Sequence, residues 1–123
     1  MESTATVLAW ITAFAHVLFM VIELFPWKRP FVFNLVKLGF DPRLENEITA
    51  APIVRNAGVY NGFIAAGLIW STWPIPEAFH LRVFFLSCAI VAGVFGAVTL
   101  TPKTLLLQAL PGAMALAAGC ATR

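Results

Sequence analysis

The sequence has few charged residues for its length. Lys, Arg, Asp and Glu make up 11% of its 123 residues, whereas hydrophobic residues make up 60%. A soluble domain carries roughly a quarter charged residues, so this chain has too little polar surface to cover a water-soluble globule. The composition therefore predicts an integral membrane protein whose exterior faces lipid over most of its area.

Residues that mark several common functional classes are also scarce. The net charge is only +2, and the basic residues are divided between loops, which gives no basic patch for nucleic acid. Cys88 and Cys120 are too far apart for a CxxC motif, so neither a redox site nor a thiolate metal site is indicated. One histidine, His16, and one carboxylate, Glu23, are too few close ligands for zinc or di-iron. We expect no nucleic-acid partner, no metal and no cofactor.

Four apolar stretches separate the short charged segments of the chain. Each approaches the twenty residues that cross about 30 Å of hydrocarbon as a helix. They cover residues of about 4–25, 51–70, 81–100 and 104–120. The predicted fold class is all-α, an integral membrane four-helix bundle that forms a single domain over residues 1–123.

The segment between the first two spans has a different character. Residues 31–50 are too polar to cross a membrane, yet Phe31, Leu35 and Leu38 recur at helical spacing beside charged residues. We expect an interfacial helix or loop between helices 1 and 2, lying on the membrane surface.

The loop charges predict an orientation. An even number of spans places both termini on one side of the membrane. The loops on the other side contain Lys28, Arg29, Lys37, Arg43 and Lys103, whereas the side with the termini has Arg82 and Arg123. By the positive-inside rule, both termini lie outside, and the protein is a multi-pass protein of the cell inner membrane.

Polar side chains inside the spans are the strongest candidates for function, because an unpaired polar group in hydrocarbon is costly. His16 and Glu23 are seven residues apart, so they share one helix face with roughly 10 Å between them. The later spans contribute Arg55, Asn56, Tyr60, Asn61, Thr99 and Gln108. Antiparallel packing places all of these residues at a similar depth. We therefore expect one polar pocket, built from all four helices and opening toward the cytoplasmic side.

Small residues accompany the polar ones. Gly58 and Gly62 form a row on nearly the opposite side of their helix from Asn56 and Tyr60, so we expect this row to pack against a neighbouring helix. Pro111 lies near the start of the last span, where it is able to bend the helix and free a carbonyl group.

The same polar residues also have structural interpretations. Glu23 and Arg55 are suited to an ion pair near the membrane interface, and a lone His16 is often a hydrogen-bonded packing residue. Asn and Gln side chains hold membrane helices together through hydrogen bonds worth about 1 kcal/mol each. The gathering of an imidazole, a carboxylate, a phenol, carboxamides and a hydroxyl exceeds what such packing requires, and this favours a functional pocket.

The order of these residues resembles a known family. His16 and Glu23 are followed by Asn56-x-Gly58-x-Tyr60-Asn61-Gly62-Phe63, by Ala92-Gly93-x-x-Gly96-Ala97-x-Thr99 and by Gln108-x-x-Pro111. This pattern is similar to a family of small bacterial four-helix membrane proteins catalogued as domain of unknown function 1304, and it covers nearly the whole chain. The resemblance implies the four-helix fold, and it implies no activity.

Two classes of function fit these residues, and the first is a membrane-embedded acid/base enzyme. It would perform isomerase, cyclase or epoxide-type chemistry on a lipophilic small molecule, with His16 and Glu23 as base and acid. The residues expected to bind the substrate are Arg55, Asn56, Tyr60, Asn61, Thr99 and Gln108. Besides this molecule, the expected partner is the lipid bilayer.

The alternative is a small proton-coupled transporter, or a lipid-binding or ligand-binding membrane protein. The chain resembles the small multidrug exporters in outline, because it has four helices and a carboxylate, Glu23, in the first. Those exporters work as dimers, so a homo-oligomer is compatible with this class. A third class is an accessory subunit that packs through Gly58 and Gly62.

Overall fold

The structure is a computed structural model that describes residues 2–25 and 50–121. Within these ranges the chain contains helices and no strand. The helices are α1 (Glu2–Leu24), α3 (Ala50–Trp70), α4 (Ala78–Thr99) and a last segment in which the π-helical turn η2 (Leu105–Ala109) continues directly into α5 (Leu110–Cys120). The predicted all-α class with four helical segments is confirmed. The interfacial helix or loop expected at residues 31–50 lies outside the described residues, apart from Ala50, which begins α3.

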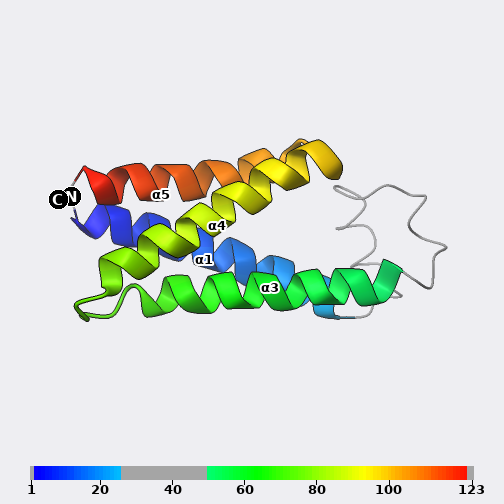
Figure 1. The fold of residues 1–123 in the computed structure, drawn as a ribbon, viewed down its shortest axis with the longest axis horizontal. Helices are drawn as coiled ribbons and strands as arrows, with labels where there is room; N and C mark the ends of the chain where they lie inside the picture. Colours follow the sequence, from blue (N-terminus) through cyan, green and yellow to red (C-terminus); the bar gives the residue numbers. More distant parts are fainter. Residues whose placement is uncertain (1, 26–49, 122–123) are drawn as a thin grey trace.

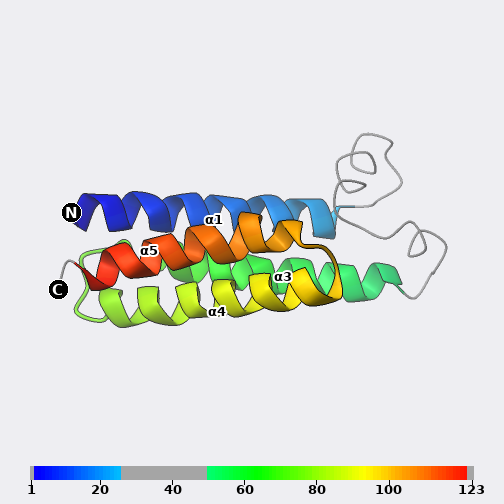
Figure 2. The same ribbon diagram turned by 90° about the horizontal axis from the view of Figure 1, so that it is seen from above.

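The four segments lie side by side as an antiparallel bundle (Figures 1 and 2). The start of α1 and the end of α5 are at the same end of the bundle. Helix α1 packs against α3 and α5, and α4 packs against η2, α5 and α3. Figure 1 shows α3 and α4 meeting near the turn that joins them and separating toward the other end of the bundle.

Polar side chains end α3 and fix the turn to α4. The hydroxyl groups of Ser71 and Thr72 donate to the carbonyl oxygens of Leu68 and Ile69, at 2.6 and 2.7 Å. The guanidinium Nη2 of Arg82 donates to the Ser71 carbonyl over 3.0 Å. A basic group at this position satisfies a carbonyl left free at the helix end and interacts favourably with the helix dipole.

Pro111 explains the π-helical turn in the last helix. It has no N–H group to donate to a carbonyl of the preceding turn. That turn is widened, and it closes with a bond from the Leu110 N–H to the Leu105 carbonyl, five residues earlier. Such turns are rare and often occur at functional sites, and Gln108 lies within this one.

One half of the bundle has a closed apolar core. Ala13, Leu68, Leu86 and Ala115, one from each helical segment, are at most 1% exposed and form a single cluster. Glycines allow the helices to approach closely beside this cluster. A Cβ atom added at Gly93 would lie 2.5 Å from the backbone nitrogen of Ala109, so α4 and the last helix are in backbone contact there.

The outside of the bundle is apolar. Two helical stretches, Thr4–Leu24 and Ala78–Thr99, are long and apolar enough to cross a membrane, and only 28% and 22% of their most apolar windows are buried within the bundle. The helix over Leu105–Cys120 is apolar but shorter. Helix α3, with Arg55 and Asn61, is not among the two. Length and composition thus support two of the four predicted crossings.

Candidate functional site

Helix α1 turns a stripe of small and polar residues toward the interior. Ala5, Ala9, Thr12, Ala13 and His16 are at most 1% exposed, and they recur at intervals of three and four residues. The Thr12 hydroxyl donates to the Leu8 carbonyl over 2.9 Å, so this buried hydroxyl is satisfied within its own helix. The stripe allows close packing of α1 and carries one titratable group, His16, into the core.

His16 has one ring nitrogen with a partner and one without. Its Nδ1 lies 2.8 Å from the Thr12 carbonyl oxygen, and because a carbonyl only accepts, Nδ1 carries the hydrogen. The opposite nitrogen, Nε2, is therefore an acceptor in the neutral ring. It is fully buried and has no hydrogen-bond partner among the described residues. An unsatisfied buried acceptor costs free energy, so this atom is suited to receive a hydrogen bond or a proton from a bound molecule.

Glu23 continues the same stripe two turns further along α1. The Asn61 side-chain amide Nδ2 donates to Glu23 Oε2 over 2.7 Å and joins α1 to α3. Asn61 is the only hydrogen-bond partner of Glu23 in the described part of the chain. Glu23 and Arg55 do not form the alternative ion pair among the described residues, and Arg55 is exposed on α3.

The glycine row of α3 creates this contact. A Cβ atom at Gly58 would lie 3.0 Å from Glu23 Cβ, and a Cβ atom at Gly62 would lie 2.8 Å from Met20 Sδ. The prediction that Gly58 and Gly62 pack against a neighbouring helix is confirmed, and that helix is α1. Because larger residues would hold α1 and α3 apart, the glycines bring the Glu23 carboxyl within reach of the Asn61 amide.

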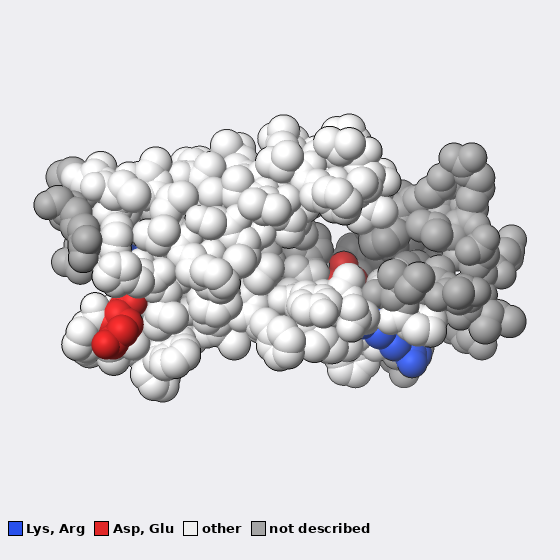
Figure 3. All heavy atoms as spheres, in the orientation of Figure 1, with Lys and Arg blue, Asp and Glu red and all other residues white. Residues whose placement is uncertain are grey.

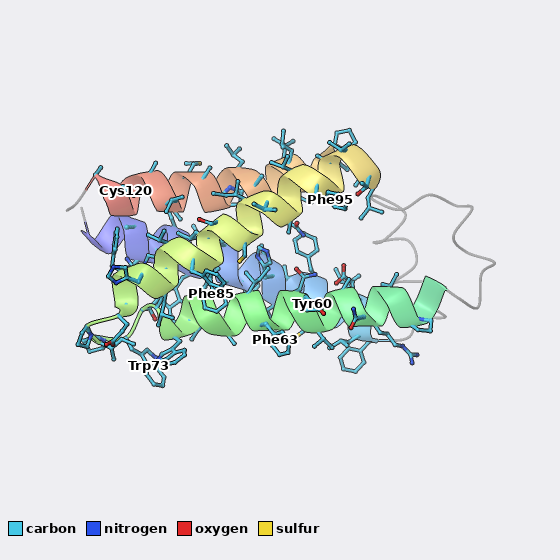
Figure 4. All side chains as sticks on the ribbon, viewed as in Figure 1. Tyr60, Phe63, Trp73, Phe85, Phe95 and Cys120 are labelled. Atoms are coloured by element: carbon cyan, nitrogen blue, oxygen red, sulfur yellow. The ribbon has the colours of Figure 1, made fainter. Side chains whose placement is uncertain are left out.

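Helices α3 and α4 touch near their connecting turn and then part. Gly67 packs under the Phe85 ring, which would overlap any side chain at that position. Tyr60 precedes Gly67 by two turns and so lies on the same helix face, yet its side chain is 60% exposed. Ala92 follows Phe85 by two turns and is exposed too. Figure 4 shows Phe85 between the two helices and Tyr60 further along α3.

The separated faces define a side opening between the helices. Asn56 precedes Tyr60 by one turn and Thr99 follows Ala92 by two turns, and both are exposed. We refer to the space bordered by Asn56 and Tyr60 of α3 and by Ala92 and Thr99 of α4 as the α3–α4 opening. Beyond the contact of Gly67 with Phe85, these faces of α3 and α4 do not cover each other.

The surface is hollowed at the α3–α4 opening. Figure 3 shows this hollow, with an acidic side chain inside it. Of the described acidic residues, Glu2 begins α1 and Glu77 precedes α4, which places both at the other end of the bundle. Glu23 lies near the end of α1 and is half-buried, and its carboxyl group accepts the hydrogen bond from the Asn61 amide of α3.

The exposure of several predicted residues does not match the expected pocket enclosed by all four helices. Asn56, Tyr60 and Thr99 are exposed at a sideways opening, and Arg55 is exposed elsewhere on α3. The physical reason is that the glycine row occupies the side of α3 that packs on α1, which turns Asn56 and Tyr60 outward. Glu23 and Asn61 are the two predicted residues that a side-chain hydrogen bond joins within the described part of the chain.

The other predicted residues have local partners. The Thr99 hydroxyl donates to the Phe95 carbonyl of its own helix over 2.8 Å. The Tyr60 ring lies edge-on to the Phe63 ring, with 6.1 Å between centroids, on the exposed surface of α3 (Figure 4). Gln108 is half-buried in η2, and its Cβ lies 2.9 Å from where a Cβ at Gly93 would be. Tyr60 and Thr99 therefore lie at the surface and Gln108 is half-buried, so the three do not form an enclosed cluster.

Two residues that matter to the site were not among the predicted site residues. Thr12 fixes the hydrogen on His16 Nδ1, and its four-residue spacing from His16 is the sequence signal that indicates such a bond. Phe85 closes one end of the α3–α4 opening, and only its contact with Gly67 reveals this.

Metal-ligating residues and cysteines do not cluster within residues 2–25 and 50–121. No group of three His, Cys, Asp or Glu residues in these ranges is able to hold a metal ion. Cys88 and Cys120 are free, the first half-buried and the second exposed.

Comparison with protein families covers nearly the whole chain. Residues 10–120 match the family described as protein of unknown function (DUF1304). The chain belongs to this family. The matched range includes His16, Glu23, the glycine row and the α3–α4 opening. No curated protein and no solved structure shows significant similarity to the chain.

Proposed function

We propose that this protein is a multi-pass membrane protein that performs acid/base chemistry on a lipophilic small molecule. The membrane location is supported by the apolar exterior of the bundle. On α1 alone, Trp10, Phe14 and Leu18 are 47%, 63% and 46% exposed, on the side away from the buried stripe. An exposed apolar surface of this kind is stable in hydrocarbon and is an aggregation hazard in water.

The observation that carries the proposal is the pair of titratable groups on the inward stripe of α1. Among the described residues, the fully buried His16 has no hydrogen-bond partner for its Nε2, and Glu23, on the same face, has a single amide partner, Asn61. Ionisable residues inside a membrane helix are costly and are functional candidates by default. A purely structural histidine would satisfy both ring nitrogens, whereas the described part of the chain offers a partner to Nδ1 alone.

The spacing of the two groups indicates the kind of reaction. Seven residues of helix separate the backbones of His16 and Glu23 by roughly 10 Å. Glu23 would give a proton to one position of an elongated substrate, and His16 Nε2 would take a proton from another. The substrate gains one proton and loses one, so its composition and oxidation state are unchanged. Isomerisation and cyclisation have this balance, as does epoxide rearrangement that begins with protonation of the ring oxygen.

A deuterium experiment tests this proposal before the substrate is known. The full chain, purified in detergent, is incubated in D₂O with a total lipid extract of the cells that produce it, and the lipids are analysed by mass spectrometry. We expect deuterium at carbon positions of one or a few lipophilic species, because Glu23 in D₂O donates a deuteron. Glu23→Gln, which keeps the shape of the side chain, is expected to abolish this labelling.

The same experiment contains the contradicting results. If the parent protein labels no lipid carbon, acid/base chemistry on a lipid is not its function. If Glu23→Gln labels as well as the parent, Glu23 is not the donor. Gly119→Ala is the matched control, because a Cβ there meets nothing within 4 Å and the variant is expected to behave as the parent does.

Proton-coupled transport is the second candidate, and one observation favours it. Glu23 has no cationic partner among the described residues, and a carboxyl group without a fixed counter-ion is able to exchange a proton for a cation. The test uses proteoliposomes with an imposed pH gradient and a dye that reports internal pH. If the protein is a proton-coupled exporter, addition of a lipophilic cation should produce a proton flux. No Glu23-dependent flux is expected from the enzyme.

Orientation in the inner membrane is a separate part of the proposal. The start of α1 and the end of α5 lie at the same end of the bundle (Figure 1), as four crossings require. In a protein with Cys88 and Cys120 replaced, Ser3→Cys is expected to react with an impermeant reagent from outside, and Thr104→Cys only after the cells are opened. Labelling of both positions from the same side would remove the four-crossing topology.

A further inference from the structure

We infer that Asn61 is a positioning residue for Glu23, and that it makes Oε1 the carboxyl oxygen that holds the proton and donates it to the substrate. This assignment rests on the proposed function, in which Glu23 is the acid, and it identifies the donating atom. It also gives Asn61 a role different from the substrate binding expected from the sequence.

Helix α3 holds the Glu23 side chain at two points. At its base, a Cβ atom added at Gly58 would lie 3.0 Å from Glu23 Cβ, so the side chain leaves α1 directly against the α3 backbone. At its tip, Oε2 accepts a hydrogen bond from Asn61 Nδ2 over 2.7 Å. Gly58 and Asn61 are three residues apart, so both contacts come from one face of α3. Contacts at both ends of the side chain limit the rotation of the carboxyl group, and its two oxygens are not equivalent.

The hydrogen bond from Asn61 decides which oxygen of Glu23 carries the proton. An amide N–H group only donates, so Oε2 is the acceptor. In a protonated carboxyl group, the carbonyl oxygen accepts hydrogen bonds better than the hydroxyl oxygen does. The amide therefore favours the form of Glu23 that has its C=O group at Oε2 and its O–H group at Oε1. A proton that leaves Glu23 for the substrate leaves from Oε1.

Asn61 also stabilises Glu23 once the proton has left. The O–H bond at Oε1 breaks, its electron pair stays on the carboxylate, and the substrate gains the proton. A carboxylate inside a membrane is costly, and Glu23 has no cationic partner among the described residues. The Asn61 amide donates to Oε2, and a hydrogen bond to an ionised acceptor is stronger than one to a neutral acceptor. The amide therefore stabilises the negative charge that develops on Glu23 in the transition state.

Infrared spectroscopy of the purified full chain tests this assignment. At acid pH, the spectrum of the parent minus that of Glu23→Gln isolates the C=O stretch of protonated Glu23, and each variant is compared in the same way with its own Glu23→Gln version. A carbonyl group that accepts a hydrogen bond absorbs at a lower frequency than one that does not. Asn61→Leu keeps a side chain of similar size and removes the donor. We expect this substitution to move the Glu23 band to higher frequency.

Ala66→Leu is the matched control, because it introduces the same side chain at an exposed position of α3. Its Glu23 band should coincide with that of the parent. A band that stays in place in Asn61→Leu would overturn the inference, because the carbonyl oxygen of Glu23 would then not be the atom bonded to Asn61. Asn61→Ala is a second variant for the case that Asn61→Leu does not fold, and the same upward shift is expected.

The deuterium assay separates failure of this inference from failure of the proposed function. We expect Asn61→Leu to transfer deuterium at least about tenfold more slowly than the parent, because a hydrogen bond to a charged group is lost. If Asn61→Leu transfers at the parent's rate while Glu23→Gln does not, the chemistry stands and the positioning role is wrong. If the infrared band shifts as expected but even the parent labels no lipid carbon, the position of the proton stands and the acid/base function is wrong.

Discussion

The two halves of this bundle are built from the same helices and differ in how closely those helices approach. In the half near the α3–α4 turn, Leu68 and Leu86 are fully buried and Gly67 lies directly under Phe85. In the other half, α3 and α4 have separated, and Tyr60 is 60% exposed at the opening. Close packing of one half holds the helices in place, so the other half is able to present polar groups at a space of fixed shape.

The difference shows that residue size at a few contacts decides where a helical bundle opens. Glycine on α3 admits the Phe85 ring at one level, and two turns away the same face carries Tyr60, which is not covered. On the α1 side, Gly58 and Gly62 keep α3 close throughout. Helix α3 is therefore separated from α4 but not from α1, and the bond between Asn61 and Glu23 is kept on the α1 side.

The largest loss of stability is expected from a cavity in the closed half. Leu68→Ala removes most of a fully buried side chain from the cluster with Ala13, Leu86 and Ala115, and should lower the free energy of unfolding by about 2–5 kcal/mol. Tyr60→Ala in the open half should change it by no more than about 0.5 kcal/mol. Reversible denaturation in detergent measures both. Equal losses would mean that the two halves are packed alike.

A smaller loss of stability is expected when a methyl group is added where α4 and the last helix are in backbone contact. Gly93→Ala places a Cβ atom 2.5 Å from the Ala109 nitrogen, and a backbone atom cannot move aside as a flexible side chain does. We expect a loss of about 1–3 kcal/mol, which is typical of overpacking. Gly119→Ala in the same set of denaturation curves is the control. If Gly93→Ala is as stable as Gly119→Ala, α4 and the last helix are further apart than described.

The hydrogen bond between Glu23 of α1 and Asn61 of α3 should contribute less to the free energy of unfolding. Asn61→Ala removes the amide that donates to Glu23, and hydrogen bonds between membrane helices are worth about 1 kcal/mol. A double-mutant cycle with Glu23→Ala, which removes the acceptor, isolates the pair, since the coupling free energy should account for most of the loss. A coupling of zero would show that the two side chains do not interact in the folded protein.

The smallest effect is expected at the border of the opening. Thr99→Val removes a hydroxyl that is exposed and bonded only within its own helix, so stability should change by no more than about 0.5 kcal/mol. Thr12→Val is the matched buried position, where the hydroxyl is fully enclosed and belongs to the turn that holds His16. A larger loss for Thr99 than for Thr12 would reverse the assignment of open and closed surfaces.

Much of the fold follows from the sequence because its signals are local. Apolar stretches of fixed length give the four helical segments, and a four-residue row gives the packing face of Gly58 and Gly62. The seven-residue spacing likewise places His16 and Glu23 on one inward stripe. Each of these depends on periodicity within one helix, which the sequence displays directly.

The parts that were wrong depend on contacts between helices. Asn56 and Tyr60 were expected inside a pocket because they are polar, but the direction they face is set by which neighbour covers the glycine row. The opening itself depends on one long-range contact, between Gly67 and Phe85, which no periodicity reveals. The π-helical turn at Gln108 needed the actual backbone, although Pro111 indicated a break in that helix.

The central claim is that His16 serves chemistry and is not a packing residue, and His16→Met tests it most directly. The substitution keeps an apolar body of similar size and removes Nε2, an acceptor with no described partner, so the protein should remain as stable as the parent or become more stable. The decisive measurement is deuterium transfer from D₂O to lipid carbon by equal amounts of folded parent and variant. The account predicts that transfer is lost in His16→Met. Transfer at the parent's rate would contradict it.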